Sequence, residues 1–191
     1  MLKRLFVIPL VITFLLSGCA APHYTEPQNG QTANVRFAVT GKANTSTVVI
    51  GFNNGRCEGG EEWIELLANT INVFPVYKRL GIPLWNYDAM AAKEYKMPAN
   101  KIMNMMILQK VTGNLDSCAI NIAPEFKEGK DYEILFNSNN CHTEINEIIT
   151  PPSQTQSYKR RLIKSFNTSF DKQSCDKEFH RRTKNVRAFT Y

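Results

Sequence analysis

Short segments of alternating apolar and polar residues, separated by turn residues, recur along most of the chain. In segment 33–39, Val35, Phe37 and Val39 alternate with Arg36 and Ala38. This period of two is typical of a strand with one buried face. Similar strand-like segments follow at 45–52, 61–68, 93–96, 101–110, 118–122, 132–136 and 142–149. Together they predict a mainly β chain folded as an antiparallel, immunoglobulin-like β-sandwich.

For two of these segments, the sequence pattern alone does not distinguish a strand from a helix. In segment 61–68 the apolar residues follow neither the period of a strand nor that of a helix. Segment 101–110 is a Met- and Ile-rich apolar run. Such an apolar run occurs both in buried strands and in short buried helices. We favour strands because the neighbouring segments are strands.

The N-terminus has the pattern of an export signal. Lys3 and Arg4 precede an apolar run over 5–16, which at about 12 residues is too short for a membrane-spanning helix of roughly 20. The run ends in Leu16-Ser17-Gly18-Cys19, which resembles the lipobox of bacterial lipoproteins. The resemblance implies cleavage before Cys19, a diacylglyceryl group on its sulfur and a third acyl chain on its amino group.

This resemblance predicts where the chain resides and, together with the polar composition of 20–32, the strand pattern and the charge distribution, how the chain is divided. We expect a signal peptide at 1–18, a lipidated flexible tether at 19–32, a sandwich domain at 33–150 and a basic extension at 151–191. Ala20 and Ala21 follow the cysteine, where an aspartate commonly marks enterobacterial lipoproteins retained at the inner membrane. The resemblance therefore implies the outer membrane, on its periplasmic face.

The positive charge is concentrated at the C-terminal end. Residues 19–150 contain 11 Lys and Arg against 14 Asp and Glu, whereas 151–191 contain 10 against 3. A basic segment on a membrane-tethered domain suits a protein partner, anionic lipid or lipopolysaccharide, and the plain alternative is a solvated face. We expect neither nucleic acid nor a small-molecule substrate. Within this extension Tyr158, Leu162, Phe166 and Phe170 recur every four residues, which predicts an amphipathic helix.

Four cysteines lie beyond the lipobox, and an even number in an exported chain predicts two disulfides. They are Cys57, Cys118, Cys141 and Cys175, and none has the CxxC spacing typical of a zinc site. We expect 118–148 to form a three-stranded meander. Its outer strands would be about 10 Å apart, beyond the reach of a disulfide between Cys118 and Cys141. The remaining pairings are Cys57–Cys118 with Cys141–Cys175, which closes shorter loops and is favoured, or Cys57–Cys141 with Cys118–Cys175.

The turn before segment 132–136 carries a second resemblance. Pro124, Gly129 and Tyr132 form a Pro-x-x-x-x-Gly-x-x-Tyr pattern. It resembles a turn of small, uncharacterised β-sandwich lipoproteins of Gram-negative bacteria, over about residues 33–150. The resemblance implies the fold and brings no activity.

The sequence offers few residues for catalysis. His23 lies in the tether, His142 follows Cys141, and His180 lies in the basic extension. Sequence patterns for a nucleophile elbow, a zinc protease or a phosphate-binding glycine loop are absent from the sequence.

An acidic cluster of Glu58, Glu61, Glu62 and Glu65 would suit glycoside hydrolysis or calcium, but lacks the spacing of a calcium loop. We therefore expect a non-enzymatic envelope lipoprotein, a binding or structural module with no cofactor and no metal. One alternative is an inhibitor or accessory subunit acting on an envelope or host hydrolase. Another is an envelope hydrolase that uses His142 or the carboxylates of 58–65.

Overall fold

The computed structural model of the chain describes residues 24–41, 45–52, 60–68, 79–84, 91–111, 118–152 and 157–166. This part of the chain contains nine strands and no helix. The strands are β1 (Thr32–Thr40), β2 (Thr45–Phe52), β3 (Glu61–Ala68), β4 (Ala91–Pro98), β5 (Asn104–Val111), β6 (Cys118–Ile122), β7 (Asp131–Asn137), β8 (His142–Ile149) and β9 (Lys159–Phe166). Each strand expected from the sequence is present, including those at 61–68 and 101–110.

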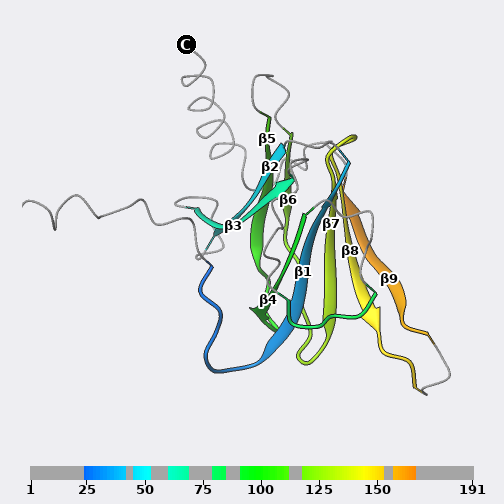
Figure 1. Ribbon diagram of the computed structural model, residues 1–191. Coiled ribbons are helices and arrows are strands. Elements are labelled where there is room, and N and C mark those ends of the chain that lie inside the picture. Colours follow the sequence, from blue (N-terminus) through cyan, green and yellow to red (C-terminus); the bar gives the residue numbers. More distant parts are fainter. Residues whose placement is uncertain are drawn as a thin grey trace, which may run out of the picture.

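The strands form two sheets packed face to face (Figure 1). The five-stranded sheet has the order β4-β1-β7-β8-β9, and the four-stranded sheet has the order β3-β2-β5-β6. Neighbouring strands of the described part are antiparallel, except that β1 runs parallel to β7. The predicted β-sandwich is confirmed.

The core between the sheets is built from the alternating side chains that the sequence pattern indicates. Val35 and Phe37 of β1 are fully buried there, beside Ile134 of β7 and opposite Val49 and Ile107 of the other sheet. Burying an apolar side chain of this size stabilises the fold by about 1.5–3 kcal/mol. Arg36 and Glu133, which alternate with these residues, therefore lie on the outer face of the five-stranded sheet.

The two central strands of the four-stranded sheet, β2 and β5, are buried on both faces. A second apolar cluster gathers side chains from β2 and β5 that alternate with those of the core: Val48, Ile50, Phe52, Met106 and Leu108. Strands buried on both faces are expected to be continuously apolar. This explains why the run 101–110 shows no alternation in the sequence.

The turn before β7 is closed by Tyr132. Its hydroxyl oxygen accepts a hydrogen bond from the backbone N–H of Lys127, at 3.0 Å, and its ring packs 5.0 Å from that of the buried Phe126. Gly129, with a φ of +68°, supplies the left-handed residue of the turn. A tyrosine at the start of a strand that bonds back to the preceding turn also occurs in immunoglobulin-type sandwiches.

The prediction of a helix around Tyr158–Phe166 is wrong, because Lys159–Phe166 form the strand β9. A spacing of four residues places side chains on one face of a helix, but also on one face of a strand, since four is a multiple of two. The basic extension that we placed after the sandwich thus adds the fifth strand of a sheet, paired with β8. Phe170 lies outside the described residues.

The exclusion of a Cys118–Cys141 disulfide is also wrong. The two cysteines form a disulfide, with 5.8 Å between their Cα atoms. The expected meander does not form, because β6 belongs to the four-stranded sheet and β7 and β8 to the five-stranded sheet. The disulfide joins the two layers, so the spacing of strands within one sheet does not apply. The Cys118–Cys141 disulfide therefore excludes both pairings that the sequence left open, including the favoured one of Cys57–Cys118 with Cys141–Cys175.

Candidate functional site

Half of the site residues expected from the sequence lie outside the described part of the chain. This holds for Cys19, Cys57, Cys175, His23, His180 and Glu58. Since Cys118 and Cys141 pair with each other, a second disulfide among the four cysteines beyond the lipobox has to join Cys57 to Cys175.

His142 and the described acidic residues lie in different sheets. His142 is half-buried at the start of β8, with its Nε2 atom 3.4 Å from Oε1 of Glu144. Glu61, Glu62 and Glu65 lie on β3, at the edge of the other sheet. Glu65 accepts a hydrogen bond of 2.9 Å from the Ser46 hydroxyl of the neighbouring strand. The structure therefore does not bring His142 and these three carboxylates together as a catalytic set.

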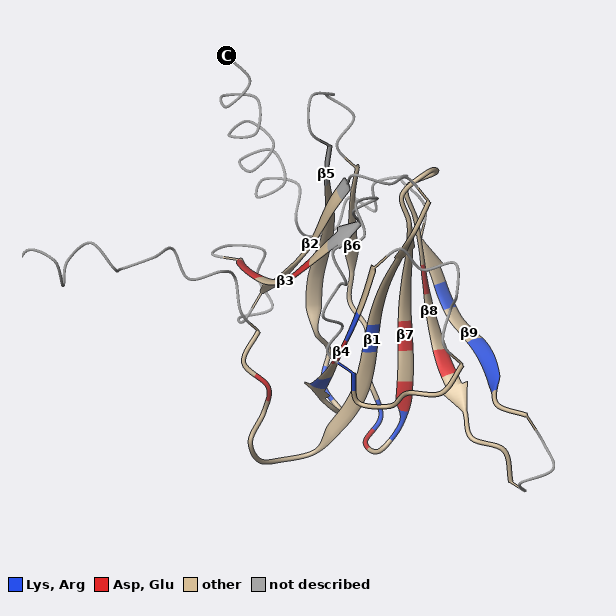
Figure 2. Cartoon of the chain, in the orientation of Figure 1, with Lys and Arg blue, Asp and Glu red and all other residues tan. Residues whose placement is uncertain are grey.

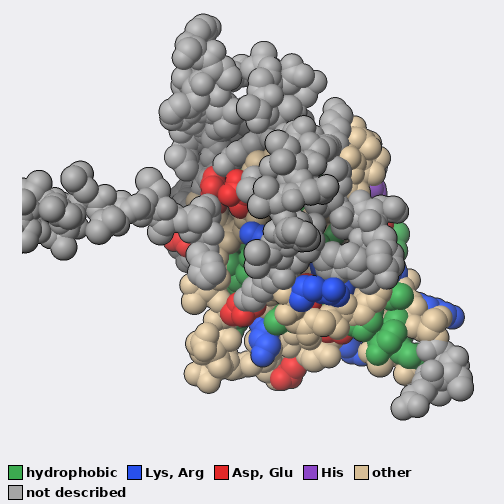
Figure 3. Space-filling view, in the orientation of Figure 1, with side chains coloured by type: hydrophobic (Ala, Val, Ile, Leu, Met, Phe, Trp, Pro, Cys, Tyr) green, Lys and Arg blue, Asp and Glu red, His purple; other side chains and the backbone are tan. Residues whose placement is uncertain are grey.

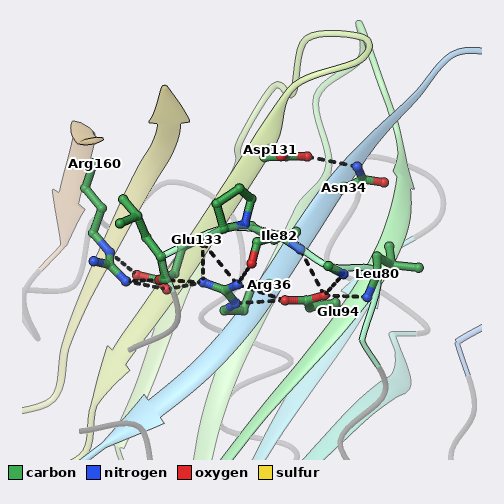
Figure 4. A network of polar contacts seen from close by, with 11 residues as sticks. Asn34, Arg36, Leu80, Ile82, Glu94, Asp131, Glu133 and Arg160 are labelled. Carbon is green, nitrogen blue, oxygen red and sulfur yellow. Dashed lines mark hydrogen bonds and ion pairs between the residues drawn. The ribbon is translucent and has the colours of Figure 1, made fainter. Parts of the chain in front are cut away.

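The outer face of the five-stranded sheet carries a buried ionic network that the sequence did not reveal (Figure 4). The strand register places Arg36 of β1 directly between Glu94 of β4 and Glu133 of β7. The guanidinium donates to Glu94 Oε1 from Nε at 3.0 Å and from Nη2 at 2.9 Å, and to Glu133 Oε1 from Nη1 at 3.0 Å. All three side chains are fully buried.

Residues 79–84, which we call the strap, cross this face and complete the network. Glu94 Oε2 accepts hydrogen bonds from the strap amides of Leu80, Gly81 and Ile82, the second at 2.8 Å. Arg36 in turn donates to the carbonyl oxygens of Ile82, Pro83 and Leu84. A buried charge is tolerated when its hydrogen-bonding capacity is filled in this way. The network therefore holds the strap against the sheet.

Arg160 extends the network to β9. Its Nε atom donates to Glu133 Oε2 at 2.8 Å, and its Nη2 atom donates to the strap carbonyl of Leu84. Glu133 is thus shared between Arg36 and Arg160, which come from two strands that are not neighbours in the sheet. Among the described residues, the side chains of this network are two arginines and two glutamates.

The strand β9 is an edge strand of the five-stranded sheet and is exposed over nearly its whole length. Every residue from Lys159 to Ser165 is exposed, with Leu162 at 55% and Ile163 at 52%. A bulge in its pairing with β8 at Ile163 interrupts the alternation of the strand. Figure 2 shows basic residues along this edge, and Figure 3 shows apolar side chains gathered near basic ones on this side of the molecule. This surface combines positive charge with exposed aliphatic side chains.

The segment before β1 is not a free tether. The ring of Tyr24 is buried against Trp63 of β3, at 5.3 Å between centroids, and Tyr95 of β4, at 5.7 Å. The Tyr24 N–H donates to the Trp63 carbonyl at 2.8 Å, and the Glu26 carboxylate accepts from the Lys96 N–H at 2.7 Å. The tether stays a prediction for residues 19–23, whereas Tyr24, as an aromatic anchor, and Glu26 contact the sandwich and Thr32 belongs to β1.

The tyrosines of this anchor predict a dependence of stability on pH. Burial, together with the charge of Glu26, raises the pKa of both Tyr24 and Tyr95 above the ordinary value. The unfolded chain ionises these groups near pH 10 while the folded chain keeps them neutral. The part of the folding free energy that depends on these two tyrosines is thus fully present below about pH 10, and it is lost as the pH rises above that value. We expect Tyr24→Phe to reduce this loss, measured by urea unfolding of the full chain at pH 8 and pH 11.

The control for this prediction is Tyr158→Phe, at an exposed tyrosine of the segment preceding β9. It should leave the difference between the two pH values as in the wild type. An unchanged difference in Tyr24→Phe would mean that the anchor does not carry the effect.

Comparison with protein-family models, with curated proteins and with solved structures finds no match to this chain. Within the described ranges, His, Cys, Asp and Glu nowhere gather in a group of three that could hold a metal ion. The same part of the chain has no helix long and apolar enough to cross a membrane. The chemistry available for a functional argument is therefore that of the ionic network, the Tyr24 anchor and the edge strand β9.

Proposed function

We propose that this chain is a lipid-anchored, non-enzymatic lipoprotein of the bacterial cell envelope, which acts as a binding module at the periplasmic face of the outer membrane. The sequence support is the short apolar run followed by Leu16-Ser17-Gly18-Cys19. Two or more acyl chains on Cys19 would hold the protein stably without a spanning helix.

The observation that carries this proposal is the position of Tyr24. Tyr24 is five positions after Cys19, and an extended chain of that length spans at most about 18 Å. Because Tyr24 packs against β3 and β4, acylation of Cys19 would keep that side of the sandwich close to the membrane surface. A docked linker of this kind suits a protein that works at the membrane and does not reach far from it.

The ionic network supports a structural role for the most deeply buried charges. Glu94 and Glu133 are fully buried, and both are bonded to Arg36. Catalytic carboxylates need access to a substrate, whereas these bind the strap and β9. The non-enzymatic proposal assigns Glu94 to holding the strap and Glu133 to holding the exposed edge strand.

The direct test is the fate of the full chain in a Gram-negative host fed a fatty acid that can be labelled. We expect the label to be incorporated into the protein, and the protein to sediment with the outer membrane in a density gradient. Cys19→Ala should abolish the labelling because it removes the acylated thiol.

The matched control is Ala20→Asp, which leaves Cys19 in place. It should keep the label and move the protein towards the inner-membrane fractions, since an aspartate after the cysteine is expected to cause retention there. Absence of label from the wild type, or labelling that persists in Cys19→Ala, would refute lipid anchoring at this residue.

A further inference from the structure

We propose that the outer edge of β9 binds an extended acidic segment of a partner protein, which adds to the five-stranded sheet as a further strand. This inference deepens the proposed function, on which it rests, by naming the binding surface and the chemistry of its partner. The relevant surface consists of Tyr158 and the exposed residues of β9.

The first argument is the state of the sheet edge. Among the described strands, β9 pairs with β8 on one side and with none on the other. A strand in this position presents backbone N–H and C=O groups that an added strand can pair with. Its residues from Lys159 to Ser165 are exposed as well, so the sandwich leaves most of the strand accessible.

The second argument is that this edge carries exposed apolar side chains in addition to protective charges such as Lys159 and Lys164. Edge strands are commonly kept soluble by charged residues that replace apolar ones. Here Tyr158, Leu162 and Ile163 are exposed, at 40%, 55% and 52%. Apolar side chains next to each other on an open edge are typical of a binding surface.

The third argument is the charge of the strand, which selects the partner. Lys159, Arg160, Arg161 and Lys164 give β9 four positive charges and no negative one. Arg160 and Arg161 are bound to Glu133 and Glu147, while Lys164 lies over the ring of Phe166. Acidic side chains alternating with apolar ones on an added strand would match this pattern, whereas a second copy of β9 would place like charges opposite each other.

The fourth argument separates a protein partner from the membrane. Tyr24 contacts β4, at one end of the five-stranded sheet, and β9 is at the other end. Four strand spacings put these edges about 19 Å apart. With the lipid anchor on the β4 side, β9 is directed away from the membrane to which Cys19 is attached. A protein segment is therefore favoured over the anionic lipid of that membrane.

The test uses the full lipidated chain in detergent micelles and a fluorescent ten-residue peptide of alternating Glu and Val. We expect saturable binding by fluorescence anisotropy that weakens as salt is raised. A peptide with Lys in place of Glu, and a Glu-Val peptide with every backbone amide N-methylated, should not bind. The methylated peptide keeps the charge but cannot pair with a strand edge.

Variants of the protein locate the site. Leu162→Ser with Ile163→Ser, and separately Lys159→Glu with Lys164→Glu, should each weaken binding by about tenfold. Arg160 and Arg161 are left intact because they stabilise the fold. The matched control is Lys101→Glu with Ile102→Ser, an exposed basic and apolar pair away from β9, which should bind as the wild type does.

Each other outcome overturns the proposal. Absence of peptide binding, or equal binding by the β9 variants, would exclude this edge as the site. Binding of phosphatidylglycerol vesicles by the Cys19→Ala chain that depends on β9, without peptide binding, would assign the surface to lipid. Self-association that the β9 variants abolish would assign it to a second copy. Because peptide binding is measured apart from membrane location, its failure is distinguishable from failure of the lipid anchor.

Discussion

Replacing Arg36 with alanine should lower the free energy of unfolding by about 3–5 kcal/mol, which is a large part of the stability of a single domain. Arg36 lies between two fully buried glutamates and also donates to three strap carbonyl groups. Its removal leaves those groups buried without the partner that compensates their desolvation. Urea unfolding of the full chain in detergent, followed by tryptophan fluorescence, measures the loss.

The control for this substitution is the replacement of an arginine whose ion pair is exposed to solvent. Arg161 bonds Glu147 on the neighbouring strand, but its side chain is 65% exposed. An exposed ion pair contributes at most about 1 kcal/mol, so Arg161→Ala should cost no more than that. Equal effects of the two substitutions would show that the network does not organise the outer face of the sheet.

Replacing both Cys118 and Cys141 with alanine should destabilise the protein by about 3 kcal/mol. The disulfide closes a loop with a sequence separation of 23, and a loop of this size restricts the unfolded chain by about that amount. It also joins the two sheets, so its loss removes a covalent link between the layers. Thermal and urea unfolding of the double variant and the wild type, both without reductant, give the difference.

The matching control is the addition of reductant. It should lower the stability of the wild type towards that of the double variant, and should change the variant by less. Labelling of Cys118 by a thiol reagent in the unfolded, unreduced wild type would contradict the pairing.

The sequence predicted the strands well because each strand depends on a local pattern. Val35, Phe37 and Val39 alternate with residues of the outer face, and β1 forms over this segment. The Pro124–Tyr132 turn likewise depends on neighbouring residues, with Gly129 left-handed and Tyr132 bonded five residues back. Such features are fixed within a few residues.

The assignment of strands to sheets could not be predicted in the same way. An alternating segment such as 118–122 is compatible with either layer, because alternation defines an inner and an outer face but no neighbour. We placed β6 beside β7, and it lies in the other sheet. The wrong cysteine pairing followed from this error, since the distance argument assumed a single sheet.

The ionic network was missed because its members are 58 and 97 residues apart in the sequence. One local signal was present. Arg36 in β1 and Glu133 in β7 each lie between apolar residues, at a position that faces away from the core, whereas Glu94 lies between Lys93 and Lys96 and gives no such signal. Charges on such a face are usually solvated, and only the register and the strap show that these three are buried together.

The most direct test of the central claim is intact and peptide mass spectrometry of the chain extracted from the bacterial membranes in which it is made, with and without reduction. We predict an N-terminal peptide that begins at a triacylated Cys19. We also predict a Cys118–Cys141 peptide pair that separates on reduction, with Cys57 and Cys175 forming the second pair. A chain that keeps residues 1–18, or begins elsewhere without lipid, would contradict the account of a lipid-anchored envelope protein.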